Sequence, residues 1–164
     1  MSIMSCAKKN DDMNPIKVNI DILGKNTEVI THDGDTITTY PFRTTIINQK
    51  EHAFGFWIMA SSFWENLIFN SNDIKIYPEI YDRNFAKLIR LSPKEKYTFE
   101  GEIVIKNLKA LKQQNDLKLG FILVRETEYS EFTDESTFSL RHVILIKKNR
   151  NDIIWCDKSI NYDW

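Results

Sequence analysis

Histidines are the first candidates for acid–base or metal chemistry, because imidazole titrates near neutral pH and binds metal ions. The three histidines are His32, His52 and His142. No two of them have the spacing of an HxH or HExxH pair. We expect His32 and His52 beside turns and His142 in a strand, without catalytic roles. Nucleophile-elbow and glycine-rich phosphate motifs are also missing, so the sequence predicts no enzyme, no catalytic residue, no cofactor and no metal ion.

Carboxylates gather in the polar stretch 125–137. The cluster consists of Glu126, Glu128, Glu131, Asp134 and Glu135. Loop oxygens can bind Ca²⁺, but the ordered spacing and central glycine of an EF-hand are missing. We therefore interpret 125–137 as a solvated loop. A glycan-acting hydrolase, which would need two carboxylates at a defined distance, stays an alternative.

Aromatic residues are dense between positions 54 and 69. They are Phe54, Phe56, Trp57, Phe63, Trp64 and Phe69. One interpretation is a stacking platform for a sugar or peptide, and the other, which we favour, is a buried core. Phe63 and Trp64 stand beside Ser61, Ser62, Glu65 and Asn66. We expect these two aromatics to be exposed and to bind a partner, if any patch in this region does.

Short alternating segments are the elements that would position these residues. Residues 16–22 alternate apolar and polar types, and 97–105 places Tyr97, Phe99, Gly101, Ile103 and Ile105 on one face. Asp33-Gly34 between β-rich runs predicts a hairpin. Further strands are expected over 42–48, 54–59, 67–69, 74–77, 88–91, 119–124, 140–146 and 152–156. Residues 107–118 favour one short helix.

The spacing of these segments is typical of a sandwich. We predict an all-β fold, an immunoglobulin-like antiparallel β-sandwich with about nine short strands and at most one short helix. It would occupy residues 16–164, behind a flexible segment over 1–15. The chain has 164 residues and a net charge of −1, which suits one domain and argues against a nucleic-acid partner. No apolar run approaches the 18 residues of a membrane-spanning helix.

The two cysteines, Cys6 and Cys156, lie near opposite ends of the chain and are expected to be unpaired. Cys156 follows Trp155 in an apolar segment, which is typical of an inert packing residue. Cys6 closes the run Ile3-Met4-Ser5-Cys6, which resembles the lipobox of bacterial lipoproteins. The following Lys-Lys-Asn-Asp-Asp resembles the charged signal of surface lipoproteins of Bacteroidota. The resemblance implies lipidation at Cys6 and a lipid-anchored place in the cell envelope; a cytoplasmic location is the alternative.

The order of strands and turns is similar to that of BsuPI-type intracellular proteinase inhibitors. The parts that carry this resemblance are 44–48, 49–52, 56–58 and 91–105. It implies a sandwich, and we carry over no inhibitory residues. We expect a non-catalytic module that binds a protein, such as an accessory lipoprotein of a cell-envelope assembly. The alternative to the assembly role is an inhibitor or immunity-type protein that docks on a protease or toxin. No small-molecule substrate is evident.

Overall fold

The computed structural model describes residues 14–30, 34–77, 85–114, 116–130 and 137–160. Over these residues the chain is mostly β, with eleven strands in antiparallel sheets and few helices. The predicted all-β, sandwich-like fold is therefore confirmed. Among the helices of the described residues, none has the length and apolar character needed to cross a membrane.

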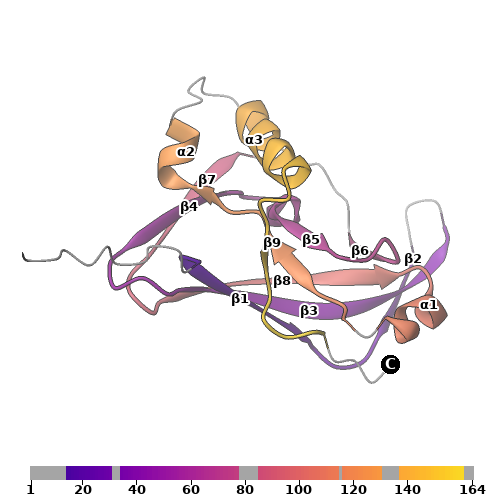
Figure 1. Ribbon diagram of the computed structural model, residues 1–164. Helices are drawn as coiled ribbons and strands as arrows, with labels where there is room; N and C mark the ends of the chain where they lie inside the picture. Colours follow the sequence, from indigo (N-terminus) through magenta and orange to yellow (C-terminus); the bar gives the residue numbers. More distant parts are fainter. Residues whose placement is uncertain (1–13, 31–33, 78–84, 115, 131–136, 161–164) are drawn as a thin grey trace, which may run out of the picture.

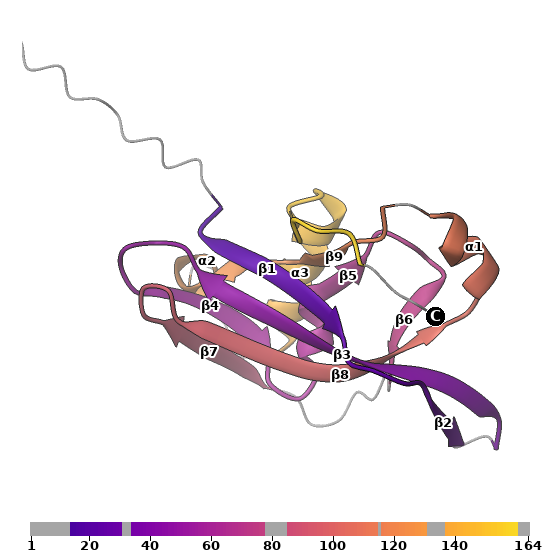
Figure 2. The same ribbon diagram turned by 90° about the horizontal axis from the view of Figure 1, so that it is seen from below.

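The first layer is a five-stranded antiparallel sheet (Figure 1). Its core order is β1-β3-β8-β6, and β2 also pairs with β3. The strands are β1 (Ile16–Ile22), β2 (Thr27–Ile30), β3 (Thr36–Asn48), β6 (Ile74–Tyr77) and β8 (Lys96–Ile105). The predicted hairpin forms between β2 and β3, which project from one end of the molecule (Figure 2).

The β-rich run that follows Gly34 and the expected strand 42–48 are one continuous strand, β3, with Pro41 in its interior. Pro41 has no N–H to give to a ladder. Its carbonyl accepts from Leu23 N–H at 2.8 Å, so its backbone faces the gap between β1 and β2. The missing donor therefore lies between the end of β1 and the start of β2, where β3 has no strand partner on that side. Strand β3 continues through Pro41 and stays paired with β8.

The second layer is built around residues 119–125. Strand β9 (Leu119–Phe121) pairs with β5 (Leu67–Phe69) and with β11 (Ile154–Trp155), while β10 (Val124–Arg125) pairs with β4 (Phe54–Met59). Strand β7 (Ala86–Leu91) lies on the other side of β4. The expected strand 119–124 is thus divided into two short strands that serve two adjacent small sheets.

Two apolar clusters hold the layers together. Phe42, Phe56, Phe99, Ile103 and Phe121 belong to the cluster between the two layers. The second cluster lies on the outer face of the second layer and includes Met59, Ile122, Val124, Leu140 and Val143. Because both faces of the second layer are covered, residues 119–124 are buried without interruption.

Helix α3 (Thr137–Asn149) covers that outer face, where the sequence predicts a strand over 140–146 (Figure 1). That prediction is wrong, and His142 is an exposed helical residue. The strand interpretation followed the β-branched content of the segment. Its buried residues Leu140, Val143 and Ile144 have helical spacing instead, and they pack as one face on the second layer.

Three smaller helical elements complete the fold. Helix α1 (Leu108–Gln113) confirms the short helix expected within 107–118, and the Asn107 side chain caps it by accepting from Ala110 N–H at 3.0 Å. The 3₁₀-helix η1 (Phe63–Asn66) precedes β5. The expected loop 125–137 begins instead as helix α2 (Glu126–Ser130), because the Glu128 carboxylate accepts from Arg125 N–H at 2.8 Å and caps its first turn.

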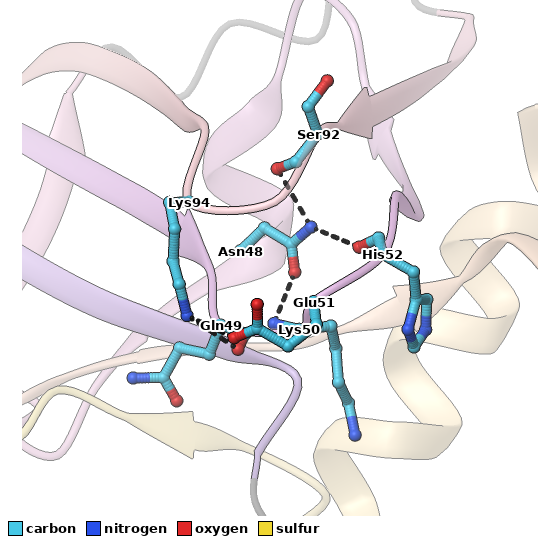
Figure 3. Close-up of polar contacts among 7 residues, drawn as sticks. All are labelled: Asn48, Gln49, Lys50, Glu51, His52, Ser92 and Lys94. Atoms are coloured by element: carbon cyan, nitrogen blue, oxygen red, sulfur yellow. Dashed lines mark hydrogen bonds and ion pairs between the residues drawn. The ribbon is translucent and has the colours of Figure 1, made fainter.

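Asn48 joins two of the connections between the layers (Figure 3). It is fully buried at the end of β3. Its Nδ2 donates to the carbonyls of His52, Leu91 and Ser92 at 2.9, 3.0 and 3.0 Å, and its Oδ1 accepts from Lys50 N–H at 2.9 Å. One side chain therefore holds both the β3–β4 loop and the β7–β8 turn.

Candidate binding cleft

A cleft with a volume of about 700 Å³ lies among the described residues. Its walls come from β6 of the first layer, from η1 and β5, and from helix α3, which covers the second layer. The lining residues are Trp64, Glu65, Leu67, Ile68, Phe69, Ser71, Asn72, Ile74, Lys75, Ile76, Lys106, Arg141, Ile144, Leu145 and Lys148. Its size is within the range of clefts that bind small molecules or peptide segments.

Helix α3 forms one wall with residues at helical spacing. Arg141, Ile144, Leu145 and Lys148 lie on the same face of the helix and all line the cleft. Ile144 is buried against the second layer, whereas Leu145 is 53% exposed. An exposed leucine between two cations is an amphipathic surface, suited to a partner with apolar and anionic groups.

Glu65 fixes the position of this wall relative to η1. Arg141 Nε donates to Glu65 Oε2 at 2.9 Å, and Arg141 Nη2 donates to Oε1 at 2.9 Å. The buried Ser62 hydroxyl also donates to Oε1. The paired geometry of guanidinium and carboxylate holds α3 in a defined orientation over the cleft.

The charge of the lining is mainly positive. Lys75, Lys106, Arg141 and Lys148 contribute four cations, and Glu65 is the one carboxylate. Lys106 and Lys148 form no ion pair with another residue of the described ranges. The cleft therefore has an apolar floor and a cationic rim, which favours a ligand of the opposite charge.

The two aromatics of the predicted partner-binding pair are partly buried, not exposed as expected, and they have different surroundings. The Phe63 ring stacks on Phe99, with 4.8 Å between ring centroids, and is half-buried against the core. Trp64 contacts Phe63 edge-on at 5.4 Å and lines the cleft. Of the other aromatics, Phe56 is fully buried, while Trp57 packs on Tyr129 with centroids 4.8 Å apart. Core packing thus accounts for most of this region, and Trp64 alone of the predicted pair reaches the cleft.

The carboxylate cluster is dispersed over two contacts in its described part. The Glu126 carboxylate binds Arg90, whose hydrogen bond holds the pKa of Glu126 below its usual range. Glu128 pairs with Lys147 at 3.1 Å. Glu131, Asp134 and Glu135 lie outside the described residues. Within the described ranges, no three His, Cys, Asp or Glu side chains gather to hold a metal ion.

Cys156 and His52 do not line the cleft. Cys156 is a free, buried thiol just after β11, as expected for a packing residue, and burial raises its pKa. Its Sγ lies 3.0 Å from the carbonyl oxygen of Lys158. His52 is exposed in the β3–β4 loop. Cys6 and His32 lie outside the described residues, so the lipidation site remains a sequence-based prediction.

Sequence reasoning missed the cleft because its residues come from three separated parts of the chain, 64–76, 106 and 141–148. The helical spacing of Arg141, Leu145 and Lys148 was the one available signal. It was obscured by the strand prediction over 140–146.

Comparisons with known proteins identify no family for this chain. No protein family and no curated protein matches the sequence. Among solved structures, a FixG-related protein from Vibrio parahaemolyticus is similar at 12% sequence identity and a TM-score of 0.38. The similarity covers 93% of this chain and 100% of that one.

Proposed function

We propose that the domain is a non-catalytic binding module, and that its cleft binds a segment of a partner protein. The observation that carries this proposal is the amphipathic lining. Exposed Leu145 lies between the cations Arg141 and Lys148 on one wall, and β6 contributes Ile76 beside Lys75 on the other. A polypeptide supplies apolar and charged side chains in close succession, so it matches both features.

The lining supports binding more than hydrolysis. Glycoside hydrolysis needs two carboxylates on opposite sides of the bond. Among the described residues that line the cleft, Glu65 is the one carboxylate and there is no histidine. Arg141 and Ser62 both donate to Glu65, so its carboxylate oxygens are engaged in fixing helix α3 to η1.

A random peptide library displayed on phage tests the proposal with the full chain as bait. We expect enriched peptides to bind the wild type and to lose at least about tenfold in affinity for a Leu145→Asp/Lys148→Glu variant. Lys96→Glu is the matched control, because Lys96 is an exposed residue of β8 outside the cleft. The proposal is wrong if no peptide is enriched, or if the cleft variant binds as well as Lys96→Glu.

We further propose that the domain is attached to the cell envelope through a lipid on Cys6. Support comes from the lipobox-like run that ends at Cys6. The DNA upstream of Met1 should encode a basic stretch followed by an apolar run of about 7–15 residues. Cells fed an alkyne-labelled palmitate should label the wild type and not Cys6→Ser. An unlabelled wild-type protein would exclude the anchor.

A further inference from the structure

We infer that the ligand of the cleft is an extended acidic segment of a partner protein, bound as an added strand on the edge of β6 that faces away from β8. The inference rests on the proposed function and specifies the chemistry of its ligand. The strand would alternate apolar residues with Asp or Glu.

The backbone of β6 offers the groups that such a strand needs. Lys106 N–H donates to Asp73 C=O at 2.8 Å, and Lys75 lies opposite Val104. Since hydrogen-bonded pairs recur every second residue, Asp73 and Lys75 bond toward β8. The N–H and C=O groups of Ile74 and Ile76 therefore point away from β8. No strand of the described part of the chain pairs with this edge.

The facing edge of β5 is less complete. Asn70 N–H donates to Lys118 C=O, and Ile122 N–H donates to Asn66 C=O, so Ile68 also bonds toward β9. Leu67 and Phe69 thus point away from β9. The N–H of Leu67 already donates to Trp64 C=O. Within the described residues, none bonds to the outward N–H and C=O groups of Ile74 and Ile76, so β6 is the better template.

Side-chain direction along β6 determines the pattern of the ligand. Ile74 and Ile76 share the inner face of the sheet with Ile103 and Ile105, opposite which they lie. An added strand would point every second side chain to this inner side, toward Phe69 and Leu145 of the cleft wall. Apolar residues satisfy these positions, because the surfaces that they would cover are apolar.

The intervening side chains would lie on the outer face. Lys75 is on this face, and Lys106 shares it because it lies two residues beyond Val104, the partner of Lys75. Both lysines line the cleft and are exposed. Opposite charges across neighbouring strands stabilise pairing, whereas like charges oppose it. Acidic residues therefore fit these positions, and a second copy of β6 would bring its own Lys75 against this one.

Peptide binding tests the added strand. The probe is the blocked peptide Glu-Val-Glu-Ile-Glu-Val-Glu, and its control is a peptide of the same composition without alternation. Two further probes carry backbone N-methyl groups, one on the odd residues of the peptide and the other on the even residues. Each therefore lacks the N–H donors along one edge of the peptide strand. We expect one methylated peptide to keep the affinity and the other to lose more than about tenfold.

Protein variants and amide exchange complete the experiment. Lys75→Glu and Lys106→Glu should each weaken binding about tenfold, while Lys96→Glu, on the same face of β8 at the other end of the strand, should leave it unchanged. The amides of Ile74 and Ile76 should exchange more slowly with the probe bound. Unchanged exchange at both amides, or equal affinity of both methylated peptides, overturns the added strand.

These outcomes are separable from failure of the proposed function. Library peptides that bind the cleft without alternation, or without backbone dependence, would retain the binding module and remove the added strand. Slow exchange of Ile74 and Ile76 that grows with protein concentration and needs no peptide would identify a second copy as the occupant. That result also overturns the acidic ligand.

Discussion

Replacement of Asn48 by alanine should remove the side-chain hydrogen bonds that tie the β3–β4 loop and the β7–β8 turn to the end of β3. The buried amide reaches three carbonyls through Nδ2 and one N–H through Oδ1. The two N–H groups of Nδ2 are shared among the three carbonyls and count as two hydrogen bonds. With the bond accepted by Oδ1, about three full hydrogen bonds are lost. At about 1 kcal/mol each, the free energy of unfolding should fall by about 3 kcal/mol. For a domain of this size, that corresponds to a melting temperature lower by about 6–12 °C.

Urea denaturation followed by tryptophan fluorescence measures this loss. Asn48→Asp should lose more, at least about 4 kcal/mol, because a carboxylate oxygen would replace the donor that faces three carbonyls. Gln49→Ala is the control, since Gln49 is exposed and its neighbours bond to its backbone. It should stay within about 0.5 kcal/mol of wild type. A loss below about 1 kcal/mol for Asn48→Ala, or an Asn48→Asp variant more stable than Asn48→Ala, would refute the reasoning.

Three further predictions concern other contacts. Gly120→Ala should lower the free energy of unfolding by about 2 kcal/mol, because an added Cβ would overlap the Ile153 side chain and lie 2.9 Å from the Trp155 ring; Gly24→Ala, whose site is open but strained, should cost less. Cys156 in a Cys6→Ser background should react with a disulfide reagent at pH 8 far more slowly when folded than in urea, since burial raises its pKa; equal rates would contradict this. Arg90 lowers the pKa of Glu126, so the ionised carboxylate should stabilise the fold above its unfolded pKa. This stabilisation should disappear as pH falls through the folded pKa. In acid titrations, the free energy of unfolding of Glu126→Gln should therefore fall less steeply than that of wild type.

Most strands could be predicted from alternation because their faces have different surroundings. Strand β8 places Phe99 and Ile103 in the core and Thr98 and Glu100 in solvent, and its pattern in the sequence is correspondingly clear. The bounds of β1 and β6 agree with the expected ones for the same reason. The bounds of β4 and β5 also agree, although these two strands are apolar on both faces and were expected from their apolar runs. Where local residue pattern and tertiary environment coincide, the sequence is sufficient.

The segment 140–146 shows where this reasoning fails. Its β-branched residues favour a strand locally. In the fold, however, this segment covers the outer face of the second layer as helix α3, with one apolar helical face. Leu140, Val143 and Ile144 share a face with the 3.6-residue period of a helix but not with the two-residue period of a strand. Leu145 is apolar but exposed, so it gives no help in choosing between the two periods. The cleft was beyond sequence reasoning for a related reason. Strand edges are defined by pairing, and pairing joins residues far apart in the chain.

The placement of α3 has a consequence for biosynthesis. Residues 119–125 form the middle of the second layer, but the helix that covers their outer face is translated after them. A ribosome that has released residues up to about 136 would present Met59, Ile122 and Val124 uncovered. A chaperone that recognises apolar sheet surfaces would bind the nascent chain at this length. It would release the chain once helix α3 emerges and covers the surface.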